Sequence, residues 1–505
     1  MTETTHFDVL IVGAGISGIG TACHLQAECP DKTFLLLEGR EDFGGTWDLF
    51  RYPGIRSDSD MHTLGYSFKP WTQAKAIADG PSIKKYLGET IHEHGLREHI
   101  KFQRLVQSAS WSSENNRWTL EVTHKDSGAR ETYTCSFLSM CSGYYSYKGG
   151  HTPEFAGRDD FSGTIVHPQA WPENFDYAGK RVVVIGSGAT AMTLVPSMAD
   201  EAGHVTMLQR SPTYVVSRPD QDWIANTLRR FLPDKLAYRI TRWKNIKMQS
   251  FMYRRTRTKP DKVREQLLKL VRKHLDDKTV DEHFTPRYNP WDQRLCLIPN
   301  DDLYDSINSG KASVVTDEID RFVEGGILLK SGETLEADII VTATGLRLVV
   351  LGDIDFSVDG EPVNFGDTWT YKAVMYSGVP NMMSTFGYIN ASWTLRADLV
   401  SAYLCRILGH MDRVGAVRCT PRLRPEDSAM TPRPWIDDFP AGYMQRSMHL
   451  FPKQGDRAPW TNPQDYLLER KDFREGPIDD GCLQFDSGHP IPATAPAQEL
   501  AVAGS

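Results

Sequence analysis

Two glycine-rich turns constrain the fold of this chain more than any other feature of its sequence. The first lies within "FDVLIVGAGISGIGTACHL" and the second within "KRVVVIGSGATAMTLVPSMA", and a further apolar run follows each, "TFLLLEGR" and "HVTMLQRSP". An apolar run, a glycine turn, an amphipathic helix and a second apolar run form the pattern of a βαβ unit that binds a dinucleotide. One such turn is a weak signal, but two predict an α/β chain with two Rossmann-like dinucleotide-binding domains.

The first turn favours a dinucleotide without a 2′-phosphate. Gly13 permits the tight turn, Gly15 lets the backbone approach a pyrophosphate, and Gly18 lets helix and strand pack closely. The N-terminus of the helix then faces the phosphates. Glu38 stands at the end of the second apolar run, where a carboxylate accepts hydrogen bonds from ribose hydroxyls.

The second turn keeps the small residues but replaces the acid. Its second apolar run ends in "QRSP", so that a guanidinium and a hydroxyl are offered where the first unit offers a carboxylate. A cation and a hydroxyl suit a 2′-phosphate, which predicts NADPH. An ordinary exposed surface charge is the alternative for the arginine. The residues expected to bind NADPH are Gly186, Gly188, Thr190, Ala191, Arg210 and Ser211.

Two dinucleotide sites in one chain imply electron transfer between two cofactors, most simply from NADPH to FAD. A disulfide reductase would carry a redox-active CxxxxC soon after its first βαβ unit. The corresponding segment here, "EDFGGTWDLFRYPGIRSDSD", contains no cysteine. We therefore expect a flavoprotein of another class, with FAD at the first turn and NADPH at the second.

Composition excludes several other classes. The formal net charge is −8, so the chain as a whole lacks the basic field that nucleic acid requires. Its eight cysteines show no CxxC and no metal-ligand spacing with histidine, which predicts no metal site. The N-terminus has no signal-peptide pattern, and no stretch is apolar for long enough to span a bilayer. We expect a cytoplasmic protein with reduced thiols.

The order of segments predicts that the NADPH domain is inserted into the FAD domain. The run "ADIIVTATG" fits the return of the chain from the second domain to the first. The expected limits are 1–146 for the first part of the FAD-binding domain, 147–218 for the first part of the NADPH-binding domain, 219–289 for a helical insertion, 290–339 for the second part of the NADPH-binding domain, 340–487 for the second part of the FAD-binding domain and the C-terminal region, and 488–505 for a disordered tail.

The helical insertion is basic, as in "YRRTRTKPDKVREQLLKLVRKHL", and Pro233 and Pro260 divide it into pieces. A solvated helical face is the commoner explanation of such a charge run. Weak contact with an anionic membrane surface is the alternative, because basic amphipathic helices bind there.

Two further motifs make the chain similar to the class B flavin-dependent monooxygenases, specifically the Baeyer-Villiger monooxygenases. "FSGTIVHPQAWP" matches the pattern FxGxxxHxxxW[P/D] at Phe161, Gly163, His167, Trp171 and Pro172. The pattern [A/G]GxWxxxx[F/Y]P[G/M]xxxD is matched at Gly44, Gly45, Trp47, Tyr52, Pro53, Gly54 and Asp58. Segments such as "YNPWDQRLC" and "GYINASWTLRADLV" resemble the ethionamide-activating subgroup of these enzymes.

The resemblance implies the chemistry. In the family, reduced FAD and O2 give a C4a-peroxyflavin that attacks a ketone and leads to an ester or lactone, and related members oxidise sulfur. It implies that Arg294 is the catalytic cation and that Asp58 orients it; an ordinary ion pair is the alternative. The loop over the flavin would include Gly45, Thr46, Trp47 and Asp58.

The resemblance also leaves some points open. Many members carry a lysine where Gln293 stands, so selectivity for NADPH would depend more strongly on Arg210. A related S- or N-oxygenase with little ketone activity, and a flavin protein that senses NADPH without turnover, are the alternatives. The expected substrate is a small apolar ketone or sulfide, and no local pattern indicates the oligomeric state. His167 and Trp171 are expected to anchor the hinge between the domains.

Overall fold

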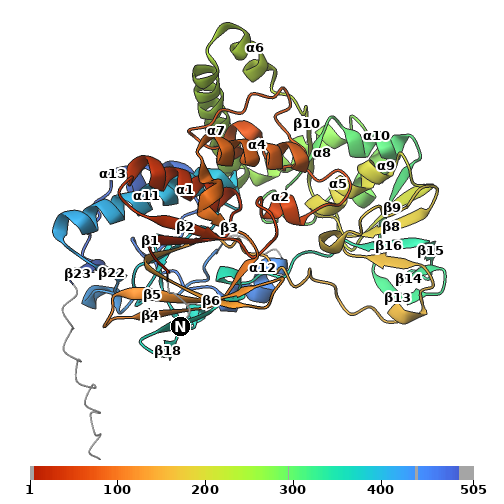
Figure 1. Cartoon of the computed structure of the whole chain (residues 1–505). Coiled ribbons are helices and arrows are strands. Elements are labelled where there is room, and N and C mark those ends of the chain that lie inside the picture. The colour runs from red at the N-terminus through yellow and green to blue at the C-terminus, as the bar shows by residue number, and fades with distance from the viewer. Residues whose placement is uncertain (1–4, 294, 438–441, 488–505) are drawn as a thin grey trace, which may run out of the picture.

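The computed structural model describes residues 5–293, 295–437 and 442–487. Two sheets lie side by side, each with helices packed on it, and a pair of helices projects from the body (Figure 1). The first sheet is built from segments before and after the second sheet in the chain. The predicted α/β class with one Rossmann-like unit inserted into another is confirmed.

The first sheet has nine strands in the order β18-β17-β4-β5-β6-β1-β2-β3, with β21 also paired to β6. β1, β2, β3, β6 and β21 pair in parallel, and β4, β5 and β6 form an antiparallel meander. The strands are β1 (Thr5–Val12), β2 (Phe34–Leu37), β3 (Ile100–Lys101), β4 (Arg104–Ser112), β5 (Arg117–His124), β6 (Arg130–Met140), β17 (Asp355–Val358), β18 (Glu361–Pro362) and β21 (Met382–Ser384).

Helices cover one face of this sheet (Figure 1). α1 packs against α11, and their apolar side chains share one core with the parallel strands. The second half of β1 and the whole of β2 consist of buried apolar residues. This is expected because a strand inside a parallel sheet is buried on both faces. The helices of this part are α1 (Ile16–Glu28), α2 (Thr46–Leu49), α3 (Met61–Leu64), α4 (Gly80–Glu93), α11 (Trp393–Val414), α12 (Gly442–Ser447) and α13 (Tyr466–Glu475).

The second sheet has five parallel strands in the order β12-β9-β8-β16-β7. They are β7 (Thr164–Val166), β8 (Arg181–Ile185), β9 (His204–Gln209), β12 (Ala312–Thr316) and β16 (Ile339–Thr342), with the helices α5 (Ala189–Met198) and α10 (Asp302–Asn308). The expected domain limit at residue 339 falls at the start of β16. The domain limits remain a prediction, because sheet membership alone does not define a domain boundary.

The helical insertion lies between two short parallel strands, β10 (Val215–Arg218) and β11 (Cys296–Pro299). It contains α6 (Trp223–Phe231), α7 (Asp234–Thr258), α8 (Pro260–Val271) and α9 (Asp277–His283). Pro233 precedes α7 and Pro260 is the first residue of α8, since proline fits the first turn of a helix but breaks its interior. The breaks predicted at both prolines are therefore confirmed.

The remaining strands form three small sheets: β13 (Ile319–Val323) with β14 (Gly326–Leu329) and β15 (Thr334–Glu336), β19 (Thr370–Tyr371) with β20 (Met375–Tyr376), and β22 (Arg418–Pro421) with β23 (Leu483–Asp486). Within the described ranges, no helix combines the length and the apolar character that a bilayer crossing would need. The predicted tail, 488–505, lies outside the described residues.

Candidate dinucleotide sites and their junction

The first glycine turn has no room for side chains. Gly13 has φ +104°, and a Cβ added to it would lie 2.6 Å from the carbonyl oxygen of Cys141. A Cβ added at Gly18 would lie 1.9 Å from the carbonyl oxygen of Gly13. Both distances are far inside van der Waals contact, so these positions require glycine and α1 packs directly on β1.

Gly15 and Gly45 bring two backbones together at the start of α1. A Cβ added to Gly15 would lie 3.5 Å from the Cα of Gly45, and the N–H of Gly44 donates to the carbonyl of Ala14 at 3.0 Å. Gly15 is the N-cap of α1 and makes no side-chain capping hydrogen bond. The first N–H groups of α1 therefore have no side-chain acceptor, which fits the pyrophosphate of a dinucleotide.

Glu38 lies at the end of β2 with its carboxylate fixed by two backbone donors. The N–H of Ala14 donates to Oε2 at 2.7 Å, and the N–H of Arg40 donates to Oε1 at 2.9 Å. Burial raises the pKa of this carboxyl, because the charged form loses water. Each oxygen keeps a lone pair for a further donor, so the position fits a ribose hydroxyl.

A cluster of charges beside Glu38 was not expected from the sequence. Arg40 Nε and Lys84 Nζ donate to the buried carboxylate of Asp48 at 2.9 and 2.6 Å. Burial opposes ionisation of Asp48, but the hydrogen bonds from Lys84 and Arg40 outweigh it and lower its pKa. The cluster fixes the first turn of α2, which begins at Thr46, and so holds the glycine loop against α1. Only the fold brings Lys84 to this place.

The second glycine turn repeats the backbone of the first. Gly186 has φ +134°, and an added Cβ would lie 2.4 Å from the carbonyl oxygen of Ala343. Gly188, the N-cap of α5, has φ −82° and ψ −177°, against φ −81° and ψ −171° at Gly15. Nothing lies within 4 Å of a Cβ added at Gly188, so the space in front of α5 is open. Ala191 is fully buried against the second sheet.

Aspartate caps α3, α4, α6, α9 and α13, in contrast to the glycines that precede α1 and α5. An aspartate cap supplies the acceptor that the first N–H groups need and leaves no place for an anion. The two glycine-capped helices that follow the sheet strands therefore retain unfilled donors where the two dinucleotides were predicted.

Gln209 holds the position in the second unit that Glu38 holds in the first. Its Nε2 donates to the carbonyl of His283 at 2.7 Å and to Oγ1 of Thr316 at 2.9 Å. The side chain is buried and uncharged, so it does not repel a 2′-phosphate. Arg210, the next residue, is exposed and forms no ion pair with any residue that the structure describes.

The remaining predicted contacts of the second site lie nearby. Ser211 is exposed, and its carbonyl accepts a hydrogen bond from Ser187 of the glycine turn at 3.4 Å. Thr190 is half-buried in the first turn of α5. The structure therefore brings the turn and the end of β9 together, and the assignment of Arg210 and Ser211 to the 2′-phosphate remains a prediction.

The loop 44–58 connects the two units. A Cβ added to Gly54 would lie 1.8 Å from Oγ of Ser197 on α5. Arg56 donates to the carbonyl of Met192 at 3.4 Å. Burial raises the pKa of Tyr52 to about 12, and a hydrogen bond with Thr190 opposes the rise. The loop thus begins at the first turn and ends on the helix of the second.

Four residues of this loop were predicted to lie near the flavin, and the first, Gly45, lies against the first glycine turn, where an added Cβ would be 3.2 Å from the Cα of Gly15. Thr46 begins α2, and Trp47 is half-buried against the core of the first unit. Asp58 is exposed to solvent and also interacts with another group of the protein. Its predicted partner, Arg294, lies outside the described residues, so the pairing of the two remains a prediction.

Two chain segments between the sheets form a hydrogen-bonded ribbon, residues 144–151 and 344–349, which we call the crossing ribbon. The N–H of Ser146 donates to the carbonyl of Arg347 at 2.8 Å, and the N–H of His151 donates to that of Gly345 at 3.0 Å. Val349 N–H donates to the carbonyl of Tyr144 at 3.1 Å. The two chain segments that connect the units therefore run side by side in the crossing ribbon.

The motif "FSGTIVHPQAWP" lies against the crossing ribbon. A Cβ added to Gly150 would lie 2.0 Å from Cε1 of His167, and Gln169 Nε2 donates to the carbonyl of Ser146 at 2.6 Å. Burial lowers the pKa of His167, which favours its neutral form. Trp171 packs on the core of the second unit. This placement supports the expected hinge-anchoring role.

The start of α11 lies beside the start of α1. Trp393 Nε1 donates to Oγ of Ser17 at 2.7 Å, and the indole stacks on Tyr144 of the crossing ribbon with ring centroids 5.2 Å apart. No local sequence pattern indicates that this helix begins against the first glycine turn. This contact brings an aromatic wall to the junction of the two units.

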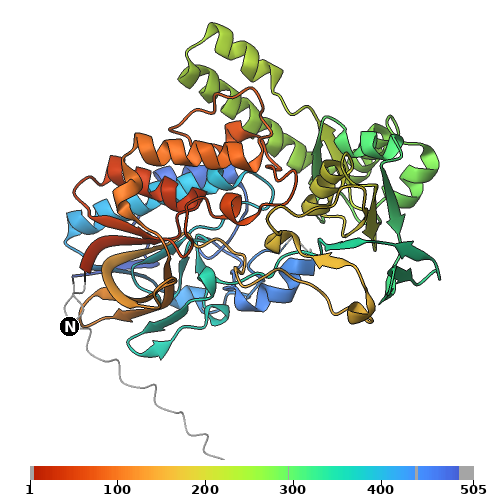
Figure 2. The same ribbon diagram turned by 45° about the vertical axis from the view of Figure 1, so that its right-hand side comes forward.

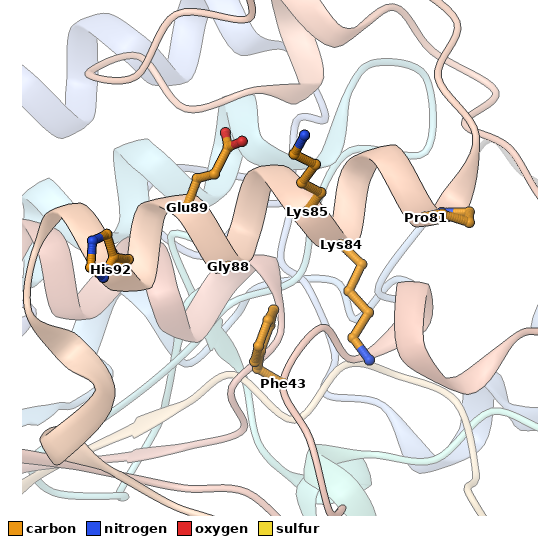
Figure 3. A pocket seen from close by; sticks show the side chains of 7 residues that line it. All are labelled: Phe43, Pro81, Lys84, Lys85, Gly88, Glu89 and His92. Atoms are coloured by element: carbon orange, nitrogen blue, oxygen red, sulfur yellow. The ribbon is translucent and has the colours of Figure 1, made fainter.

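A shallow surface hollow lies on α4, outside both glycine turns. Its lining residues are Phe43, Pro81, Lys84, Lys85, Gly88, Glu89 and His92. Figure 3 shows Lys84 and Phe43 on one side of the helix and Lys85 and Glu89 on the other. None of these residues belongs to either predicted dinucleotide site, and we assign no cofactor to the hollow.

The fold and the two turns define a flavoprotein that also binds a nicotinamide dinucleotide. Residues 7–352 match the family of flavin-binding monooxygenase-like proteins. The chain belongs to this family, and it is an enzyme with FAD and NADP as cofactors.

The relatives and the solved structures agree with this. The chain is 53% identical over 484 residues to the FAD-containing monooxygenase EthA of Mycolicibacterium smegmatis, covering 95% of this chain and 97% of that one. It is 52% identical to EthA of Mycobacterium tuberculosis, covering 95% and 98%.

Among solved structures, an oxidized steroid monooxygenase bound to NADP superimposes with a TM-score of 0.71 at 26% identity, covering 84% and 89% of the two chains. Cyclohexanone monooxygenase in an open form has a TM-score of 0.74 at 22% identity, covering 96% and 100%. The similarity to cyclohexanone monooxygenase shows that the two chains share a fold.

Proposed function

We propose that this enzyme is a Baeyer-Villiger monooxygenase that converts small apolar ketones to esters or lactones and also oxidises sulfur in thioethers or thioamides. One oxygen atom of O2 enters the product and the other leaves as water, while NADPH supplies the two electrons and a proton is taken up. The observation that carries the proposal is the loop 44–58, which extends from the first glycine turn to α5 of the second.

Each of the two glycine turns would bind one cofactor. The glycine turn at α1, with Glu38 at the ribose, holds FAD, and the turn at α5, with Arg210 at the 2′-phosphate, holds NADPH. FAD held at the first turn would supply the hydride acceptor for NADPH and the means to activate O2. The loop 44–58 and the crossing ribbon set the distance between the two dinucleotides, because a small error in placement costs a large part of the rate.

The proposed catalytic pair is Arg294 with Asp58. A guanidinium stays charged at every working pH, so it can stabilise the negative charge that develops on the oxygen of an attacked ketone. Asp58 ends the loop that contacts both units, which supports its role in orienting a cation at the junction. The placement of Arg294 in this pair follows from the sequence motif.

We place the reaction in the cytoplasm. Among the residues that the structure describes, no cysteine forms a disulfide, and seven of the eight cysteines are buried. Free thiols persist where glutathione and thioredoxin keep proteins reduced. Fractionation of cells that express the chain with a C-terminal tag would test this placement.

The deciding experiment uses a matched pair of substrates, an aryl methyl ketone and the corresponding aryl methyl sulfide, with NADPH and ¹⁸O2. Catalase is present because hydrogen peroxide from uncoupled turnover oxidises sulfides without help from the site. We expect an ester with one ¹⁸O atom, a labelled sulfoxide and labelled water. Unchanged ketone beside labelled sulfoxide would instead identify an S-oxygenase. A reduced enzyme that is not reoxidised by O2 would mean a protein without turnover.

A further inference from the structure

The helices α6 and α7 form a projecting pair, the α6–α7 hairpin, residues 223–258 (Figures 1 and 2). Trp223 is 73% exposed and Phe231 is 80% exposed, the two largest values among the large apolar residues that the structure describes. Further exposed apolar side chains of the hairpin are Ile240, Trp243, Met248 and Phe251. The hairpin therefore gathers bulky apolar groups where water surrounds them.

One face of α7 is occupied by contacts with the body. Arg242 Nη1 donates to the carbonyls of His62, Thr63 and Gly65 at 3.0, 3.1 and 2.7 Å. Tyr238 donates to the carbonyl of Tyr66 at 2.9 Å. These contacts fix the rotation of α7 about its own axis and decide which side chains face outward.

The outward face of α7 carries both apolar and cationic side chains. Its exposed members recur every three or four residues, the spacing of one helix face, and are Ile240, Trp243, Lys247, Phe251 and Arg254. The stripe from Ile240 to Phe251 spans about 16 Å at 1.5 Å per residue. It is long enough to lie along a surface.

The charge of the hairpin opposes that of the whole chain. Residues 223–258 contain ten lysines and arginines and one acid, Asp234, in a chain of net charge −8. Some of these cations are paired, as Lys244 is with Asp222 at 2.7 Å. The exposed cations that form no ion pair with any described residue are Arg230, Lys235, Arg239 and Lys247.

We propose that the α6–α7 hairpin docks on a membrane surface that contains anionic lipids. Tryptophan and phenylalanine enter the boundary between headgroups and acyl chains, while lysine and arginine reach anionic headgroups from the same helix face. Each cation near such a surface adds to binding. A second copy of the chain fits this surface less well, because protein interfaces are depleted in lysine, and lysine lies in the middle of the stripe.

The test measures sedimentation of the full-length, FAD-loaded protein with vesicles of phosphatidylcholine that contain phosphatidylglycerol, and with vesicles of phosphatidylcholine alone. We expect binding to the anionic vesicles to be about tenfold tighter or more, and raised salt to weaken it. Equal binding to both kinds of vesicle, or none to either, would overturn the proposal.

Two variants separate the apolar and the electrostatic contributions. Trp223→Gln with Trp243→Gln and Phe251→Gln removes aromatic groups, and Arg239→Glu with Lys247→Glu reverses two charges. Each variant should lower the partition coefficient about tenfold or more while the visible absorbance of bound FAD is kept.

The matched controls lie elsewhere on the surface. Leu468→Gln changes an apolar side chain that is 61% exposed on α13, and Lys125→Glu with Lys330→Glu reverses two exposed charges. Both controls should bind vesicles as the unchanged protein does. If the controls weaken binding as much as the hairpin variants, the hairpin is not the docking surface.

Analytical ultracentrifugation without lipid completes the test. An oligomer that the hairpin variants dissociate, and that does not sediment with vesicles when intact, would mean that copies of the chain cover this surface. A mass that stays the same in all variants, together with lost vesicle binding, would support the membrane.

Discussion

Gln209 occupies, at the end of β9, the place that Glu38 occupies at the end of β2. The N–H of Gly13 donates to the carbonyl of Leu37 at 2.8 Å, and the N–H of Gly186 donates to that of Leu208 at the same distance. The residue after each carbonyl is almost fully buried, with 4% of Glu38 and 1% of Gln209 exposed. The two units thus differ by one charge at equivalent positions.

Gln209→Glu should weaken the preference for NADPH over NADH. A carboxylate there would lie close to a 2′-phosphate and repel it, so the ratio of kcat/KM for NADPH to that for NADH should fall about tenfold or more. Steady-state kinetics with both coenzymes measure this ratio. If the substitution only distorted the site locally, kcat/KM would fall for NADPH and NADH alike. An unchanged ratio would contradict the equivalence of Gln209 and Glu38.

Arg210→Ala should weaken NADPH selectively. Loss of a charge-assisted hydrogen bond to the 2′-phosphate should raise the KM for NADPH about tenfold to a hundredfold and leave that for NADH within about twofold. Lys180→Ala, which removes another exposed cation of the second unit, is the matched control. Equal effects on the two coenzymes would mean that Arg210 is an ordinary surface charge.

His167→Ala should slow the transfer of electrons without loss of FAD. Removal of the imidazole beside Gly150 loosens the crossing ribbon, and the rate of flavin reduction by NADPH should fall about tenfold or more. Anaerobic stopped-flow absorbance measures this rate. The control is His204→Ala, which changes a histidine on the second sheet. In this variant NADPH should reduce the flavin at the normal rate.

Gly150→Ala provides the companion to this variant, since its Cβ would lie 2.0 Å from the imidazole. It should slow reduction by itself, and its effect should shrink in the background of His167→Ala, because the clash needs both groups. Loss of FAD from His167→Ala would instead mean that the residue only supports the fold.

His24 should make stability depend on pH. Burial alone would lower its pKa, but the carboxylates of Asp398 and Glu28 outweigh it and raise the pKa to about 9. Since this folded value exceeds the ordinary histidine pKa of 6.5, the stabilisation is fully present below about pH 6.5 and is lost as the pH rises through about 9. It amounts to about 3 kcal/mol at most.

Chemical denaturation of the unchanged protein and of His24→Gln at several pH values checks this. The difference in free energy of unfolding between the two should be largest in mildly acidic solution and should shrink toward pH 10 or so. A difference that stays constant with pH would show that His24 contributes through packing alone.

The two βαβ units could be predicted because their signals are local. Gly13 and Gly186 adopt positive φ, and Gly18 meets the backbone of Gly13 within its own unit. A few neighbouring residues determine each turn, and the insertion of one unit into the other follows from the order of the segments. The same holds for the prolines that divide the helical insertion.

Other parts of the site depend on contacts between distant segments. Lys84 reaches Asp48 across 36 positions, and the equivalence of Gln209 with Glu38 needs the register of strands in two sheets. No pattern of neighbouring residues carries that information. Likewise, the charge run predicted helices at 219–289, but the contacts of Arg242 with α3 decide which face of α7 remains outside.

The crossing ribbon limits how the two units can move. The two connections are hydrogen-bonded to each other, so they join the units at one place, and the loop 44–58 adds a second contact on α5. A change in the angle between the units would therefore have to bend both connections together and shift the loop on α5.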